Sequence, residues 1–163
     1  YGIALSYRYT GNPEYVRLFE EVTGYFLDHL PHSLVPYWDF IFQDGSMEPR
    51  DSSAAAVAAC GMLEMAKYLP EEKASYYTGY FLDHLPHSLV PYGIASRLMK
   101  ALYDTCAAKS DSESDGLLLH GVYGRKTPYN DCIDHGIDEC NLWGDYYYLE
   151  GLVRLKYDWN PYW

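Results

Sequence analysis

The apolar residues of this chain recur mainly three or four positions apart, and runs that alternate apolar with polar residues are scarce. This pattern predicts helices rather than a sheet, so we expect an all-α fold built from antiparallel helix pairs. The first predicted helix ends near Tyr9, and the others span Pro13–Leu30, Ser52–Leu69, Ile94–Lys109 and Leu142–Tyr157. Long loops, at 32–50 and 116–139, lie between them.

Two of these helices have clear start signals in the sequence. Asn12 and Asp51 are suitable N-cap residues, and Pro13 suits the first position of a helix. Nearly every side chain from Ser52 to Gly61 is small, which lets neighbours approach closely and predicts an inner helix. For the helix that ends at Pro31, the predicted core-facing stripe is Tyr15, Leu18, Phe19, Val22 and Phe26.

The sequence TGYFLDHLPHSLVPY occurs twice without a difference, at Thr23–Tyr37 and at Thr78–Tyr92. Diverged structural repeats would share an apolar pattern and only scattered identities, so an identical copy indicates a duplicated segment. Removing residues 79–92 joins the flanks into one helical stretch, free of the interruptions that Pro86 and Pro91 introduce. We interpret 79–92 as an insert and expect the first copy to pack against the core. The stripe of the joined helix would be Tyr77, Ile94, Leu98, Met99 and Leu102.

Composition and charge narrow the function classes. The chain has 163 residues, 48% of them hydrophobic, which suffices for one domain with a core. A net charge of −11 argues against nucleic acid or an anionic membrane as partner. No run approaches the roughly 20 apolar residues of a membrane span, and no signal peptide is visible. Because Tyr1–Thr10 reads as the end of a helix already under way, we expect further chain before it.

Residues that bind metals are present but poorly arranged. His29 and His32 are separated by Pro31, and the pair at His84 and His87 is a copy of them, so neither favours a metal site. Cys132, His135 and Cys140 lack an evident fourth ligand and are interpreted as loop residues. The spacing of the four cysteines is not that of a secreted disulfide scaffold, so we expect reduced thiols. No phosphate-binding glycine loop is present, and no cofactor is predicted.

The segment from Leu117 to Thr127 concentrates hydrogen-bond donors. Three leucines precede His120, and Arg125, Lys126 and Thr127 follow within eight residues. In an acidic chain, an imidazole, two cations and a hydroxyl so close together favour an anionic ligand. A solvated loop with a satisfied histidine accounts for the same residues equally well.

Long stretches of the chain, in order, resemble one known family. The segments are GIALSYRYTG with PEY, VPYWDF, PRDSSAAAVAACGMLE, GLLLHGVY and LWGDYYYLEGLVRL. Together they resemble the C-terminal half of an unsaturated glucuronyl hydrolase, family 88 of the glycoside hydrolases. The resemblance covers nearly the whole chain apart from residues 79–92. It implies that 1–163 form an incomplete (α/α)6 toroid, a ring of helical hairpins, in agreement with the predicted helices.

The resemblance also implies a reaction and a substrate. Family members remove 4,5-unsaturated glucuronic acid from the non-reducing end of oligosaccharides left by polysaccharide lyases. An Asp acts as general acid and then base while water adds to the vinyl ether bond, and no cofactor is needed. That Asp and its partner belong to the N-terminal half of the family, so no catalytic residue is assigned here. A cytoplasmic location is implied by the family alone.

Binding residues carry over only to the second loop. His120 matches a position at the rim of the family's pocket, and Gly124 and Thr127 match positions near the sulfated or downstream sugar. Gly124 lacks the hydroxyl that is typical there, which Arg125 and Lys126 could offset by their charge. The predicted ligand is an anionic unsaturated oligosaccharide bound by these five residues.

Other acidic residues and other functions remain to be weighed. Asp51, Ser52 and the Trp143–Asp145 motif are interpreted as helix caps and packing residues, and neither Asp39 nor Asp145 is assigned as an acid. An unsaturated rhamnogalacturonyl hydrolase and a non-catalytic sugar- or partner-binding helical module are the alternatives. Because half a toroid exposes apolar faces, self-association is also expected.

Overall fold

The computed structural model describes residues 1–78, 93–110, 114–128 and 136–160. In these ranges the chain is all-helical, as predicted, and the only extended pairing consists of three isolated bridges. The helices are α1 (Gly2–Thr10), α2 (Glu14–Asp28), α3 (Ser52–Ala66), α4 (Glu71–Thr78), α5 (Ile94–Thr105) and α6 (Leu142–Lys156).

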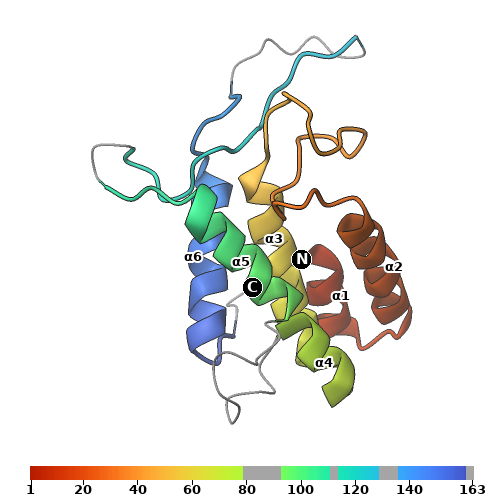
Figure 1. The fold of residues 1–163 in the computed structure, drawn as a ribbon. Coiled ribbons are helices and arrows are strands. Elements are labelled where there is room, and N and C mark those ends of the chain that lie inside the picture. The colour runs from red at the N-terminus through yellow and green to blue at the C-terminus, as the bar shows by residue number, and fades with distance from the viewer. Residues whose placement is uncertain (79–92, 111–113, 129–135, 161–163) are drawn as a thin grey trace.

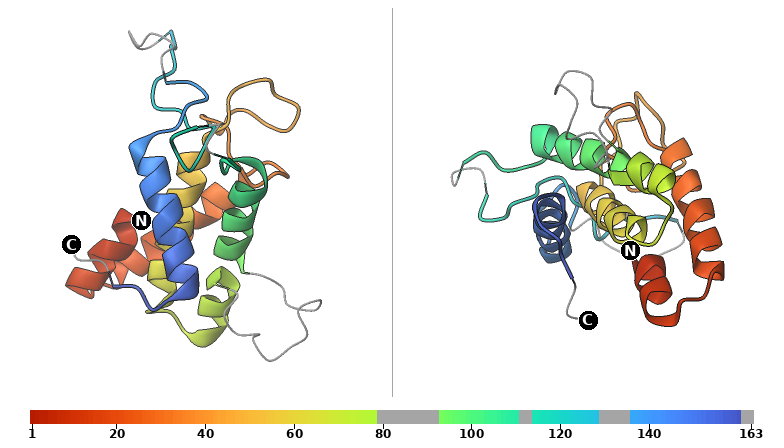
Figure 2. Two further views of the ribbon diagram at one scale, coloured as in Figure 1. Left: turned by 90° about the vertical axis from the view of Figure 1, so that its left-hand side faces the viewer. Right: turned by 90° about the horizontal axis from the view of Figure 1, so that it is seen from below.

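The helices form two layers. The inner layer is α1, α3 and α6, with α3 in the middle, while α2 packs outside α1, and α4 and α5 pack outside α3 (Figures 1 and 2). Inner and outer helices that alternate along the chain are the organisation of an (α/α) toroid. The described part supplies one open arc of such a ring, with α6 at one edge.

Helix α3 is the centre of the core, as its small side chains predict. Twelve of its fifteen residues are buried, so it has no solvent face and contacts α1, α4, α5 and α6. A glycine is needed at position 61 because the backbone of Tyr1 approaches α3 closely there: a Cβ would lie 2.8 Å from the Tyr1 nitrogen. Asp51 caps the helix, and its side chain accepts a hydrogen bond from the Ser53 N–H at 3.1 Å, as predicted.

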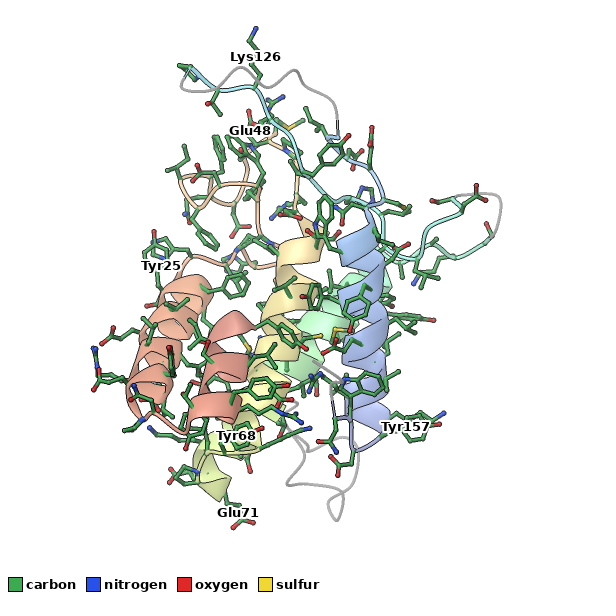
Figure 3. The ribbon with its side chains drawn as sticks, turned by 180° about the vertical axis from the view of Figure 1, so that it is seen from behind. Tyr25, Glu48, Tyr68, Glu71, Lys126 and Tyr157 are labelled. Atoms are coloured by element: carbon green, nitrogen blue, oxygen red, sulfur yellow. The ribbon has the colours of Figure 1, made fainter. Side chains whose placement is uncertain are left out.

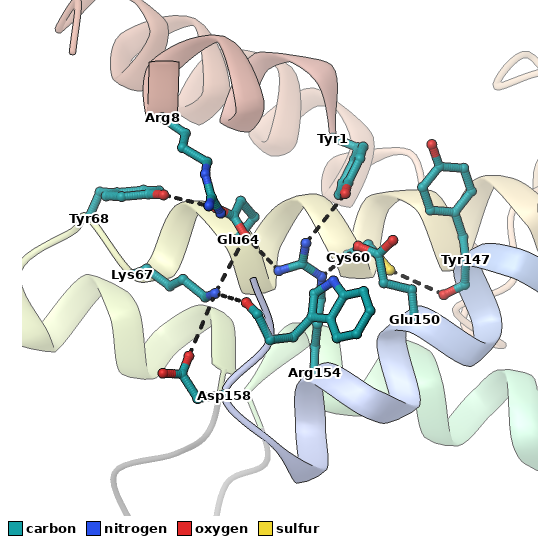
Figure 4. Close-up of polar contacts among 11 residues, drawn as sticks. Tyr1, Arg8, Cys60, Glu64, Lys67, Tyr68, Tyr147, Glu150, Arg154 and Asp158 are labelled. Carbon is teal, nitrogen blue, oxygen red and sulfur yellow. Dashed lines mark hydrogen bonds and ion pairs between the residues drawn. The ribbon is translucent and has the colours of Figure 1, made fainter. Parts of the chain in front are cut away.

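A buried ionic network joins the three inner helices (Figure 4). Glu64 of α3 is fully buried and accepts hydrogen bonds from Arg154 of α6 at 2.6 Å, Arg8 of α1 at 3.2 Å and Tyr68 at 2.9 Å. Arg154 also donates to Glu150 at 2.6 Å. Burial alone would raise the pKa of Glu64, but the hydrogen bonds from Arg154 and Tyr68 hold it below its usual value. The Glu64 carboxylate therefore stays charged and paired in the interior.

Three details of the predicted helices are corrected. Helix α3 ends at Ala66 because the next three residues form tighter i→i−3 turns. Helix α5 ends at Thr105, short of Lys109, because 106–108 pair with 117–119. In α2, Leu18 and Val22 are exposed rather than core-facing, because this outer helix is rotated to bury Phe19 and Thr23.

The predicted stripe of α4 and α5 is confirmed. Tyr77, Leu98, Met99 and Leu102 are buried, and Ile94 packs against them. The first copy of the duplicated sequence also packs as predicted, with Thr23, Pro31 and 35–37 buried. Its second copy at 79–92, including His84, His87, Pro86 and Pro91, lies outside the described residues, so the insert interpretation stays a prediction.

The residues that flank the duplicated segment lie close together. The Ser96 hydroxyl donates to the Thr78 carbonyl at 2.9 Å, and α4 and α5 follow one another roughly along one line (Figures 1 and 2). With 79–92 removed, Ser96 would be the fourth residue after Thr78. A helical serine donates to the carbonyl four residues back, so this contact matches one continuous helix.

Candidate functional site

Two loops gather at the end of the molecule where α3 and α6 begin. The first loop is 31–51, and the second loop comprises the described residues of 106–110, 114–128 and 136–141. Both lie at one end of the helices (Figure 1). The opposite end of the bundle carries α4 and the C-terminal end of α6. Helix N-termini and loops on a rigid helical base form a typical location for a ligand site.

Asp145 anchors the second loop to α6. One of its carboxylate oxygens accepts hydrogen bonds from the backbone N–H of Leu117 at 2.9 Å and of Leu118 at 2.8 Å. Beside it, the Trp143 indole donates to the Ser53 hydroxyl of α3 at 3.2 Å. The Trp143–Asp145 motif thus joins α3, α6 and the loop, in agreement with its interpretation as a packing motif.

His120 is held in a strained conformation by contacts on both sides. Its carbonyl accepts from the Ser52 N–H at 3.0 Å, and Gly121 exchanges backbone hydrogen bonds with Glu139 at 2.8 and 3.1 Å. His120 has φ 64° and Asp138 has φ 61°, the left-handed region that side chains other than glycine rarely adopt. Their side chains meet, with His120 Nδ1 2.5 Å from Asp138 Oδ1. Strain of this kind concentrates at functional sites, which supports a role for this pair.

A second ion pair links the two loops. Arg125 Nη2 lies 3.1 Å from Glu48 Oε2, and the same carboxylate oxygen accepts from the Trp38 indole at 2.9 Å. Both charged side chains are about three-quarters buried, with exposures of 27% for Arg125 and 29% for Glu48. The positive charge of Arg125 is therefore balanced by Glu48, a partner that the linear sequence did not reveal.

The remaining predicted residues follow the outer part of the second loop. Gly124 and Thr127 are half-buried, and Lys126 is exposed at the loop's tip, on the same side as Glu48 (Figure 3). The five predicted residues thus share one loop without converging on one point. Tyr123, which the sequence reasoning missed, packs edge-on against Trp143 at 5.9 Å between ring centres.

Three residues of the first and second loops were missed for one reason. Trp38, Glu48 and Asp138 reach the site only through folding, since Glu48 is 77 residues from Arg125 in sequence and Asp138 is 18 from His120. The sequence gives only a general indication of these contacts: in a strongly acidic chain, basic side chains are expected to pair with acidic ones. That signal does not say which acid pairs with which base.

Histidines and cysteines form no metal site in the part of the chain that the structure describes. The His29 ring stacks on the Tyr25 ring, with 4.0 Å between the ring centres. His32 Nδ1 lies 2.5 Å from Asp44 Oδ2, and this hydrogen bond raises the pKa of His32. Cys140 lies 3.1 Å from the Ser114 hydroxyl, and the described cysteines are free thiols. Cys132 and His135 lie outside the described residues.

A pocket at the opposite end of the bundle does not compete with the loop site. It lies between α3, α4 and the segment after α6, and its charged lining includes Lys67 and Arg154. Both cations are already paired with Glu64, so they do not offer an unsatisfied charge to a ligand. None of the described helices is long and apolar enough to cross a membrane.

The described part of the chain is an arc of an (α/α) toroid that carries strained, charged loops over the ends of its inner helices. The comparisons specify the family. Over 163 residues, all of this chain, it is 45% identical to an unsaturated chondroitin disaccharide hydrolase of Streptococcus pyogenes serotype M1, and it spans 36% of that relative. It is 35% identical over its full length to an unsaturated glucuronyl hydrolase of Bacillus sp. strain GL1, of which it spans 38%. No family model matches the chain.

Solved structures agree with the sequence comparison. The unsaturated glucuronyl hydrolase of Streptococcus agalactiae superposes with a TM-score of 0.80 at 41% identity, covering all of this chain and 36% of that one. A variant of the same enzyme was solved in complex with dGlcA-GalNAc6S. Along its whole length this chain is thus homologous to one part of the unsaturated glucuronyl hydrolases, as the sequence resemblance predicted. It spans little more than a third of their length.

Proposed function

We propose that this chain forms part of an unsaturated glucuronyl hydrolase that acts on unsaturated glycosaminoglycan disaccharides. The observation that carries the proposal is the similarity along all 163 residues to hydrolases named for chondroitin disaccharides. The S. agalactiae relative in complex with dGlcA-GalNAc6S supports an anionic disaccharide as the ligand. The names of these relatives favour this function over that of a rhamnogalacturonyl hydrolase.

The chain's contribution is binding by the two loops. His120, positioned by Asp138, offers its imidazole to a sugar hydroxyl or carboxylate. Trp38 and Tyr123 add aromatic surface of the kind that contacts sugar rings. Gly124, Arg125, Lys126 and Thr127 extend the site along the second loop. The five residues predicted from sequence act here as substrate-binding residues.

Proton transfer is assigned to a part of the hydrolase that this chain does not contain. The two candidate acids have structural partners, because Asp145 accepts two loop N–H groups and Asp39 accepts from the Ile41 N–H at 3.0 Å. In the proposed reaction the acid protonates the vinyl ether, water adds, and the resulting hemiketal opens to release the sugar. The isolated chain should therefore bind the disaccharide without turning it over.

Binding and turnover are separated by two measurements on the chain. Titration with the unsaturated disaccharide, followed by saturation-transfer NMR, should show contact with the sugar protons. His120→Ala should weaken that binding by roughly tenfold, the cost of losing one or two hydrogen bonds. The ultraviolet absorbance of the C4=C5 bond should stay constant during incubation. Its decay above a buffer blank would show that a catalytic acid is present after all, whereas lack of binding would refute the loop site.

We also propose that isolated chains self-associate through the exposed face of α6. Helix α6 lies at the edge of the arc (Figure 2), and its Leu142, Tyr146, Leu149 and Leu152 are all at least one-third exposed. A contiguous apolar face of this kind recruits a partner, here a second copy. Sedimentation should show dimers or larger species that Leu149→Lys reduces. A compact monomer that binds no hydrophobic dye would contradict this.

A further inference from the structure

We propose that Glu48 is a specificity-determining residue, which lowers the affinity of the loop site for doubly charged disaccharides. The proposal rests on the proposed function, since it concerns the ligand of the same loops. Glu48 lies at the loop end of the molecule, on the same side as Lys126 (Figure 3). It brings one negative charge to the place where the second loop concentrates its cations.

The geometry fixes Glu48 in this position. One carboxylate oxygen accepts from the Trp38 indole at 2.9 Å and from Arg125 at 3.1 Å, and the other oxygen lies 3.4 Å from Arg125. The Glu48 backbone N–H donates to the Ser46 hydroxyl at 3.2 Å. The side chain is therefore held by Trp38 and Arg125 and the backbone by Ser46, so the carboxylate does not leave the site freely. Its charge acts as a constant part of the electrostatic potential there.

Coulomb's law then predicts a dependence on ligand charge. An unsulfated unsaturated disaccharide carries one carboxylate, whereas dGlcA-GalNAc6S carries a sulfate as well. A fixed negative charge beside the site repels each ligand charge, so the penalty is about twice as large for the second ligand if its two charges lie at similar distances. Partial exposure of Glu48, at 29%, keeps the effect modest because water screens it.

Glu48→Gln tests this with little change of shape. The amide oxygen can still accept from the Trp38 indole, whereas the NH2 group that replaces the other oxygen cannot accept from Arg125, so the charge and one weak contact are lost. We expect affinity for dGlcA-GalNAc to rise roughly two- to threefold and affinity for dGlcA-GalNAc6S roughly four- to tenfold. The gain should shrink in high salt, because screening acts on charge and not on packing. Affinities are measured by calorimetric or NMR titration of both disaccharides.

Glu71→Gln is the matched control, because Glu71 lies at the opposite end of the molecule (Figure 3). It makes the same change in net charge, so an equal gain there would show a global effect and overturn the proposal. The double variant Glu48→Gln with Arg125→Gln removes the pair without changing net charge. Because Arg125 is itself a proposed binding residue, the double variant should lose the gain in affinity for dGlcA-GalNAc6S that Glu48→Gln shows, and an undiminished gain would overturn the electrostatic explanation.

The outcomes separate this inference from the proposed function. If neither disaccharide binds the unmodified chain, the loop site itself is refuted and this inference with it. If both bind and Glu48→Gln leaves the ratio of affinities unchanged, only the role of Glu48 is refuted. A ratio that rises in Glu48→Gln, stays constant in Glu71→Gln and falls again with salt supports it.

Discussion

The molecule contains the same pair of side chains in two settings. Arg154 and Glu64 lie 2.6 Å apart with exposures of 2% and 0%, whereas Arg125 and Glu48 lie 3.1 Å apart with more than a quarter of each exposed. The first pair joins the inner helices, and the second joins two loops. In the interior a lost partner leaves an unsolvated charge, while in the loops water replaces it. The buried pair Arg154–Glu64 is therefore expected to matter for the stability of the fold. The partly exposed pair Arg125–Glu48 is expected to matter less for stability and can act on a bound ligand.

The largest expected effect comes from breaking the buried pair. Arg154→Met leaves Glu64 and Glu150 in the interior without their main cation. Removal of one partner of a buried ion pair costs about 3–5 kcal/mol, so urea denaturation should show a loss of this size. Arg17→Met, in the exposed pairs of α2, is the control and should change stability little. Equal losses in both variants would show that burial does not distinguish them.

Acidification should affect the same network. The pKa of Glu64 in the folded chain lies below its ordinary value of 4.5. Its pairing therefore contributes stability above about pH 4.5, and this contribution is lost as the pH falls through the folded pKa. The difference in unfolding free energy between the unmodified chain and Glu64→Gln should shrink over that range. A difference that stays constant down to the folded pKa would contradict the assignment.

Among the loop contacts, the largest loss of stability is expected on removing Asp145, which anchors the backbone of the second loop to α6. Asp145→Ala leaves the N–H groups of Leu117 and Leu118 without their acceptor. Leu118 is buried, whereas water can replace the acceptor at the exposed Leu117, so a loss of about 1–3 kcal/mol is expected from Leu118. Asp145→Asn keeps an acceptor oxygen and should lose less. Amide hydrogen exchange should accelerate at 117–121 and remain slow in α3. Global acceleration in Asp145→Ala would show that the anchor belongs to the core instead.

The smallest effect is expected from deleting residues 79–92. The Ser96 hydroxyl already contacts the Thr78 carbonyl at 2.9 Å, so the flanks can join as one helix. Thermal melting should be unchanged or improved, because the loop-closure entropy disappears. A large loss of stability on deletion would refute the insert interpretation and support a true structural repeat.

The helices were predictable because their signals are local. Asp51, Asn12 and Pro13 mark helix starts, and the Asn12 side chain does accept from the Glu14 N–H at 3.0 Å. The small residues of α3 predicted its inner position in the same way. Sequence also identified His120 and its loop, since a cluster of donors in an acidic chain is visible without coordinates.

Errors arose where a distant segment decided the outcome. Helix α5 was predicted to continue to Lys109, but backbone pairing with 117–119 takes over after Thr105. Leu18 and Val22 fit a helical stripe equally well facing outward. The rotation of α2 is set by its packing against α1 and by the contact of Phe19 with Tyr77 of α4. Local periodicity does not contain that information.

The sequence by itself determined the all-helical class, the loop that carries His120 and the family resemblance, because propensity, capping and motif order are properties of neighbouring residues. Only the tertiary structure determined which charged side chains of the site pair with one another. It brought Glu48 to Arg125 across 77 positions and Asp138 to His120 across 18. Ion pairing depends on distance in space, and chain folding sets that distance through contacts far apart in sequence.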